Sequence, residues 1–165
     1  MQTININLDI KEIVYDIQNK TFLTGKSRRD GANHEQVENM QDNDDEENAN
    51  QVLRSISMAF SNLKTKLGEY LDLARTTATN ELIASDEELH LGLKMPSNYN
   101  SSTVDTLAAA AHQYVVSMAV ADWFTITHKT DAPEYSSLAE VSLQIISEAV
   151  NKRSRPKRTV STAGQ

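Results

Sequence analysis

The segment STVDTLAAAAHQYVVSMAVADWFTITH, from Ser102 to His128, decides the fold class of this chain. It contains neither Gly nor Pro, and its apolar residues recur at the three- and four-residue spacing of a helix. One stripe and the residues that widen it are Val104, Leu107, Ala108, Ala111, Val115 and Met118, then Ala110, Tyr114, Ala121 and Phe124. A helix that is apolar around most of its circumference is normally surrounded by other elements. The sequence therefore predicts a central helix.

Two other segments alternate apolar and polar residues, which is the period of a half-buried strand. Their apolar members are Ile4, Ile6, Leu8 and Ile10 in the first and Leu89, Leu91, Leu93 and Met95 in the second. The two runs match in period and length, so we expect them in one small sheet. Asp9, with Glu12 three residues later, resembles a capping box and predicts a helix start. This helix should fade near Asn19, before a turn at Gly25.

Two further helices complete the expected bundle. Apolar residues between Gln51 and Arg75 are spaced by threes and fours: Leu53, Ile56, Phe60, Leu63, Leu67, Tyr70 and Ala74. We interpret this seam as a helix packed on the central helix, with an intermolecular coiled coil as the alternative. Asp131, followed by Ala-Pro-Glu, signals the last helix, whose buried face should be Leu138, Val141, Ser142, Ile145, Ile146 and Ala149. The predicted fold is mainly α, a bundle of about four helices with a small two-stranded β element.

Charge is distributed unevenly along the 165 residues, whose formal net charge is −7. Eight acids and no Lys or Arg lie between Asp30 and Asn50, and five bases and no acid lie between Asn151 and Gln165. We expect one helical domain over residues 1–150, with a polar acidic loop at 26–50, and a basic C-terminal tail at 151–165. Such asymmetry indicates two surfaces with different partners. The chain has no Cys, which excludes disulfides, and no apolar run of membrane-spanning length, so we expect no membrane partner.

Motifs for catalysis or cofactors are weak. Gly25-Lys26-Ser27 resembles the end of a phosphate loop, but Lys20 stands where the first Gly belongs, and the DNDDEE run lacks the Gly and Glu spacing of a calcium loop. His112 and His128 lie sixteen residues apart on one helix, about 24 Å by its rise, so they cannot share a metal within one chain. We expect no enzymatic activity, no metal and no cofactor.

Three adjacent residues near the end of the central helix are candidate structural or interface residues. Asp122 faces the apolar stripe and needs a partner, either Lys129, donors around Thr125 and Thr130, or an Arg of a neighbouring subunit. Trp123 and Phe124 point about 100° apart on the helix. We expect one of them to pack near Leu138 to Ile145 of the last helix and the other toward the seam between Leu53 and Tyr70.

Four short segments together resemble the small structural proteins of the head-to-tail region of tailed bacteriophages. They are Met-Pro-Ser-Asn after the second strand, Ala-Asp-Trp-Phe in the central helix, Lys-Thr-Asp-Ala in the following turn, and Asn-Lys-Arg-x-Arg-Pro at the end of the last helix. The similarity covers residues 86–158. It implies a virion protein, assembled in the host cytoplasm, that forms a homo-oligomeric ring beneath the portal protein and meets neighbouring neck or tail proteins. Carried over, the portal-docking residues would be Lys152, Arg153, Arg155, Lys157 and Arg158.

Other functions stay open at this stage. The N-terminal strand and the acidic insertion depart from the small adaptors, so a stopper or tail-side ring protein is an alternative. A nucleic-acid-binding module could use the five positive charges of the tail on phosphates, including genome DNA, although no aromatic residue interleaves them. A chaperone or regulator with a helical body is a further possibility.

Overall fold

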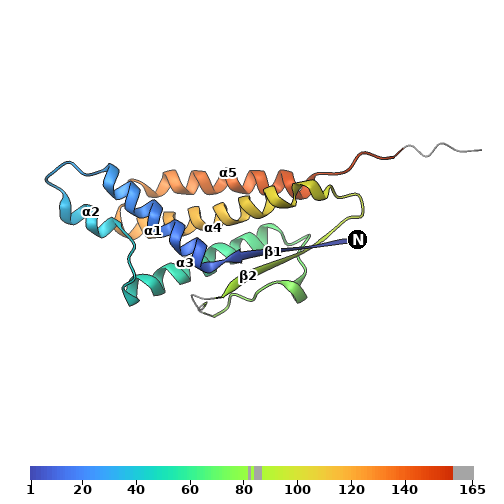
Figure 1. The fold of residues 1–165 in the computed structure, drawn as a ribbon, viewed down its shortest axis with the longest axis horizontal. Helices are drawn as coiled ribbons and strands as arrows, with labels where there is room; N and C mark the ends of the chain where they lie inside the picture. Colours follow the sequence, from blue (N-terminus) through green and yellow to red (C-terminus); the bar gives the residue numbers. More distant parts are fainter. Residues whose placement is uncertain (82, 84–86, 158–165) are drawn as a thin grey trace, which may run out of the picture.

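The computed structural model describes residues 1–81, 83 and 87–157. In chain order its elements are strand β1 (Gln2–Asp9), helices α1 (Ile10–Ser27), α2 (His34–Met40) and α3 (Glu46–Lys66), strand β2 (Glu88–Met95), and helices α4 (Val104–Thr127) and α5 (Ala132–Asn151). Short 3₁₀ turns η1 (Leu73–Arg75) and η2 (Ser101–Thr103) precede β2 and α4. The predicted class, mainly helical with a two-stranded sheet, is confirmed, although the described residues form five α-helices and not four (Figure 1).

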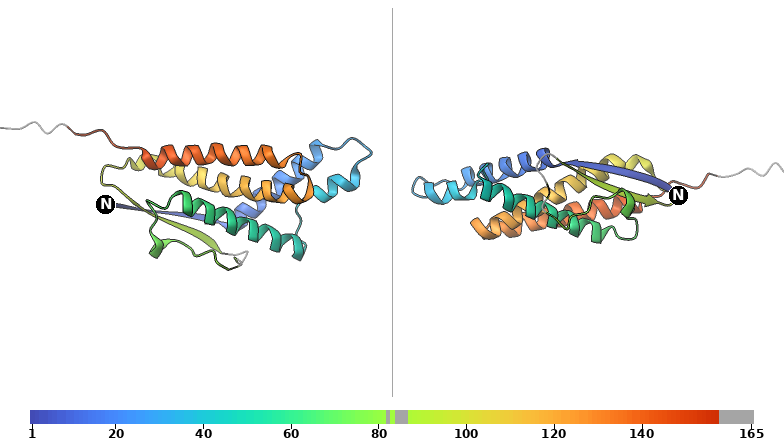
Figure 2. Two further views of the ribbon diagram at one scale, coloured as in Figure 1. Left: turned by 180° about the vertical axis from the view of Figure 1, so that it is seen from behind. Right: turned by 90° about the horizontal axis from the view of Figure 1, so that it is seen from below.

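Helix α4 is the central element, as the sequence predicts. It contacts α5, α3, α1, α2 and β1, and it lies between α5 and α3 in the left view of Figure 2. Its buried residues are Leu107, Ala110, Ala111, Tyr114, Val115, Val116, Ser117, Ala119, Val120, Ala121, Trp123 and Phe124. Asn100 caps the η2 turn, and α4 begins at Val104 directly after this turn.

The two predicted strands pair antiparallel, from Gln2 opposite Met95 to Asp9 opposite Glu88. The apolar members of both strands face the bundle and are buried, which is the expected outcome of period two. Residues 70–77 run along the free edge of β2: Asp72 N donates to Gly92 O at 2.8 Å and Lys94 N donates to Tyr70 O at 2.7 Å. Gly92 is required there, because a Cβ would lie 2.6 Å from the Cβ of Arg75.

Helix α1 begins where predicted but runs further. The Asp9 carboxylate accepts a hydrogen bond from Lys11 N, which caps the helix. The helix continues past Asn19 to Ser27, and Gly25 lies inside it, not in a turn. The reason is a close helix contact, since a Cβ on Gly25 would lie 3.2 Å from Val37 O. The glycine therefore admits α2 against α1.

The expected polar acidic loop at 26–50 is wrong as a description of this segment, because much of it is helical. Helix α2 lies inside it, and α3 already begins at Glu46. Val37 and Met40 are buried beneath the otherwise polar segment, and Asp42 N donates to Thr21 Oγ1. The composition of residues 26–50 predicts a mobile loop. Two buried apolar side chains and a few long-range hydrogen bonds instead hold this segment against the rest of the chain.

Helix α3 ends earlier than the predicted limit at Arg75, at Lys66 before Gly68. Leu53, Ile56, Phe60 and Leu63 are buried within the same chain, against α4. The interpretation of the seam as a helix packed on the central helix is therefore confirmed. No helix of the described residues is long and apolar enough to cross a membrane.

Helix α5 covers one side of α4, but only half of its predicted buried face is buried. Ser142, Ile146 and Ala149 are covered, whereas Leu138, Val141 and Ile145 are exposed. The predicted face is wider than one neighbouring helix can cover. This leaves an apolar stripe on the surface of the chain.

Candidate functional site

The C-terminal arm, residues 152–157, starts where α5 ends and is anchored to the loop before α4. Asn100 N donates to Lys152 O at 3.1 Å, and Ser154 N donates to Asn98 O at 2.8 Å. Tyr99 and Arg153 form an isolated antiparallel bridge between these hydrogen bonds. The arm therefore leaves the body from a fixed point.

Beyond this anchor the arm is exposed. Lys152, Arg155 and Lys157 carry exposed side chains, and Figure 1 shows the chain running away from the end of α5. No ion pair within the described part of the chain involves these three cations. Arg153 differs from them, because its guanidinium donates to Val150 O at 2.8 Å and closes the end of α5. The predicted docking residue Arg158 lies outside the described residues.

The three candidate residues of α4 have partners that differ from the expected ones. Ser55 Oγ of α3 donates to Asp122 Oδ2, so the donor is a hydroxyl but not one near Thr125 or Thr130. Trp123 is buried, and its indole donates to Met40 O at 2.8 Å, at the end of α2 and not on the α3 seam. Phe124 packs on Tyr135 with ring centroids 5.4 Å apart, one turn before the expected stretch of α5.

Asp122 also borders a pocket of about 180 Å³ between α3, α4 and the start of α5. Met58, Met118 and Ala59 contribute its apolar wall, and Asn62 contributes an amide. Within the described ranges no Lys or Arg lies in ion-pair contact with Asp122. The half-buried carboxylate is held by Ser55 and keeps one side toward this pocket.

An ionic cluster at the turn between α4 and α5 was missed by the sequence analysis. Asp131, which is buried, lies 2.5 Å from Arg28 Nη2 and 2.9 Å from His128 Nδ1. The Asp131 carboxylate raises the pKa of the Arg28 guanidinium through its hydrogen bond and its charge. Arg28 caps the end of α1, so the cluster ties α1 to the α4–α5 turn. The signal in the sequence was Asp131 itself, interpreted only as a helix cap.

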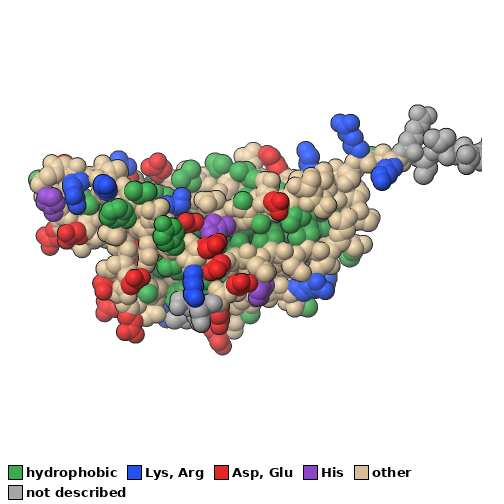
Figure 3. Space-filling view, in the orientation of Figure 1, with side chains coloured by type: hydrophobic (Ala, Val, Ile, Leu, Met, Phe, Trp, Pro, Cys, Tyr) green, Lys and Arg blue, Asp and Glu red, His purple; other side chains and the backbone are tan. Residues whose placement is uncertain are grey.

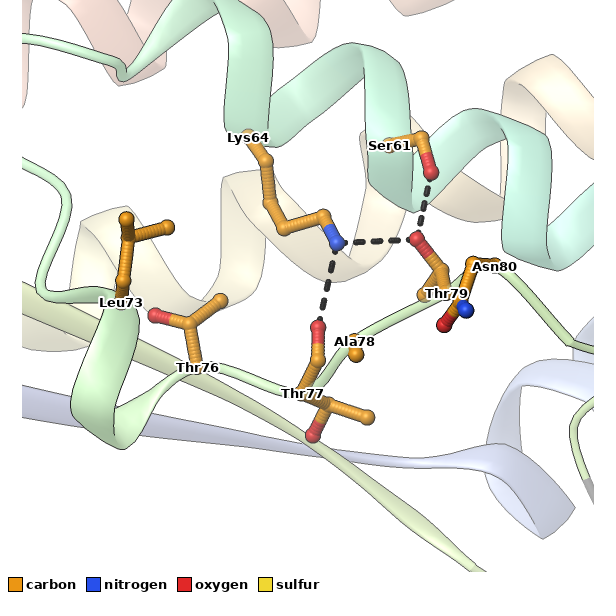
Figure 4. A pocket seen from close by; sticks show the side chains of 8 residues that line it. All are labelled: Ser61, Lys64, Leu73, Thr76, Thr77, Ala78, Thr79 and Asn80. Carbon is orange, nitrogen blue, oxygen red and sulfur yellow. Dashed lines mark hydrogen bonds between the residues drawn. The ribbon is translucent and has the colours of Figure 1, made fainter.

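Two further polar contacts also hold elements together. His112 Nε2 lies 2.7 Å from Asp16 Oδ2 and joins α4 to α1. In the pocket of Figure 4, about 460 Å³, Lys64 Nζ donates to Thr77 O at 3.1 Å and to Thr79 Oγ1 at 2.8 Å. Burial lowers the pKa of this ammonium, which also lies 5.4 Å from the centre of the Phe60 ring. Lys64 thus fixes residues 77–79 against α3.

The described residues contain no group of three or more His, Asp or Glu placed to hold a metal ion. No family model, no curated protein and no solved structure matches this chain. Among the features described so far, the anchored cationic arm and the exposed apolar stripe of α5 face outward.

Proposed function

We propose that this protein is a ring-forming structural component of the head-to-tail connector of a tailed bacteriophage, which docks on the portal protein through its C-terminal arm. The observation that carries the proposal is the arm itself, anchored at residues 152–154 and exposed at Arg155 and Lys157. A rigid exit point and a short extended cationic segment suit insertion between partner subunits, because little entropy is lost when a preset segment binds.

The segments that carry the resemblance fall at two structural junctions, which supports the proposal. The Met-Pro-Ser-Asn segment supplies Asn98, whose carbonyl accepts the arm, and Asn-Lys-Arg begins the arm. At the other end of the bundle, Asp-Trp-Phe covers α2 and Tyr135, and Lys-Thr-Asp-Ala holds the ionic cluster at Asp131. The similar residues therefore fix where the arm leaves and how α4 and α5 meet.

The test is co-purification of the full chain with the portal protein of the same phage. The double variant Arg155→Glu and Lys157→Glu should reduce capture at least tenfold. The control variant Lys66→Glu and Lys129→Glu makes the same charge change on exposed residues of the body and should bind normally. Equal capture of both variants would contradict docking through the arm.

The same variants distinguish portal docking from the alternative function, nucleic-acid binding. A module that binds nucleic acid through the arm would shift DNA in a salt-dependent way, and the arm variant would lose that shift while portal capture stayed unchanged. Recovery of the protein from purified virions would favour the structural role over a chaperone or regulator.

A further inference from the structure

The exposed stripe of α5 has the composition of a contact surface. Leu138, Val141 and Ile145 are 47 %, 55 % and 39 % exposed and lie on one side of the helix. Glu134 and Glu148 extend the same stripe at its two ends, and α5 contains no Lys or Arg. We call these five residues the α5 patch. Large aliphatic side chains that recur along one face of an exposed helix indicate an interaction site.

A second exposed stripe lies on α1. Tyr15 is 67 % exposed and Phe22 is 43 % exposed, and Lys11 and Lys26 extend the stripe at its two ends. We call these four residues the α1 patch. Hydrophobic and basic side chains lie next to one another over this helix in Figure 3. Phe22 and Lys26 also line a pocket of about 280 Å³ together with Arg29, Val37, Glu38 and Gln41.

The two patches match in spacing as well as in charge. The outer aliphatic residues of the α5 patch are seven positions apart, as are the two aromatic residues of the α1 patch, which is about 10 Å by helix rise. The terminal acids of α5 are fourteen positions apart and the terminal lysines of α1 fifteen, about 21 Å and about 22 Å. The order acid, aliphatic, acid on α5 is therefore complementary to the order lysine, aromatic, lysine on α1.

These patches cannot meet within one chain. Helices α1 and α5 already contact each other through Thr24 and Tyr135, whose hydroxyls are 2.7 Å apart, and through Arg28 and Asp131. The patches remain exposed beside these contacts. Each patch could therefore be covered by the other patch only on a second copy of the chain.

We propose that the α5 patch of one copy packs on the α1 patch of the next copy, with Glu134 and Glu148 opposite Lys11 and Lys26. A contact between two different surfaces leaves one of each free at the ends of a chain of subunits, so it builds a ring when the rotation closes. This contact gives the subunit interface of the proposed connector ring and in that respect rests on the proposed function.

Charge reversal and rescue test the pairing in the full chain. Glu134→Lys with Glu148→Lys, and separately Lys11→Glu with Lys26→Glu, should each weaken self-association at least tenfold in sedimentation and native mass measurements. Mixing the two variants should restore assembly to within about threefold, since each supplies the patch the other can bind. Glu140→Lys, which reverses an exposed acid on another side of α5, should assemble as the unaltered chain does.

Site-directed cross-linking gives an independent measurement, because the chain has no natural Cys. Val141→Cys in one sample mixed with Tyr15→Cys in another should form a disulfide heterodimer faster than Glu140→Cys mixed with Tyr15→Cys. Equal rates, or reversal variants that assemble normally, would overturn the inference.

The outcomes also separate this inference from the proposed function. Self-association that follows the patches, without portal capture, would keep the interface and reject the connector role. Portal capture by a chain that stays monomeric up to millimolar concentration would keep the connector role and reject the interface.

Discussion

Asp42 is a buried acid whose carboxyl group is costly to ionise in the folded protein. It follows α2, is 2 % exposed, and its Oδ1 has no hydrogen-bond partner among the described residues. Burial, together with the charge of Asp44, raises the pKa of Asp42 from 3.8 to about 6. The folded protein therefore binds this proton more tightly than the unfolded chain does. The group favours folding below about pH 4, and that contribution is lost as the pH rises to about 6.

Replacement of Asp42 by Asn removes the charge and keeps the shape. We expect Asp42→Asn to stabilise the protein at pH 7 by up to about 3 kcal/mol, because the pKa rises by about two units and each unit corresponds to about 1.4 kcal/mol. The gain should disappear at pH 4, where the acid is protonated. Urea unfolding of both proteins at pH 4, 5.5 and 7 measures this, and a gain that did not depend on pH would contradict the raised pKa.

Ser55 and Asp122 form a hydroxyl–carboxylate pair between α3 and α4. Ser55→Ala should cost about 1–2 kcal/mol, because it leaves a half-buried carboxylate without this donor. Asp122→Asn should cost less than about 1 kcal/mol, since an amide can still accept the hydrogen bond. A double-mutant cycle with Asp122→Ala isolates the coupling. Additive losses would show that the hydroxyl does not stabilise Asp122.

Trp123 holds α2 in place through its ring and its indole N–H. Trp123→Ala should cost about 3–5 kcal/mol, as expected for loss of a buried large ring. Trp123→Phe should cost less, and its effect should concentrate in α2, where amides of residues 34–40 lose protection from hydrogen exchange first. A loss below about 1 kcal/mol for Trp123→Ala would mean that the ring does not support the core.

At the scale of elements, the C-terminal arm consists of an anchored part and a free part. Truncation after Ser154 keeps the hydrogen bonds that anchor the arm and should leave the melting temperature unchanged. Truncation after Asn151 also removes the hydrogen bonds to Asn98 and Asn100, so it should lower the melting temperature by several degrees. Calorimetry on the two truncated chains decides this, and equal melting temperatures would show that residues 152–154 do not anchor the arm.

At the scale of the whole molecule, α4 connects the bundle to α2 and to the sheet. If any of these elements detached from α4, apolar surface would be exposed to water. We therefore expect the chain to unfold in a single cooperative transition. Fluorescence of Trp123, the only tryptophan, and far-ultraviolet circular dichroism should give coincident urea curves. An earlier fluorescence transition would show instead that α2 detaches before the rest.

The sequence by itself determined the elements whose pattern is local. Neighbouring residues are enough to recognise α4 and the two strands, because their apolar residues repeat about every 3.6 or every two positions. The acid and proline at the start of α5 are likewise close together in the chain. The same holds for the Asp9 cap, which the structure confirms. The acidic and basic segments are also local features, because the composition of each stretch is enough to define them.

Tertiary structure alone decided what depends on distant contacts. Residues 26–50 are ordered by Val37, Met40 and the indole of Trp123. Trp123 is more than eighty positions away from Met40, so the composition of the segment cannot predict this contact. The partner of Asp122 and the cluster at Asp131 likewise join separate helices. The stripe of Leu138, Val141 and Ile145 reads as core in the sequence, because periodicity shows that a face is apolar but not whether anything covers it.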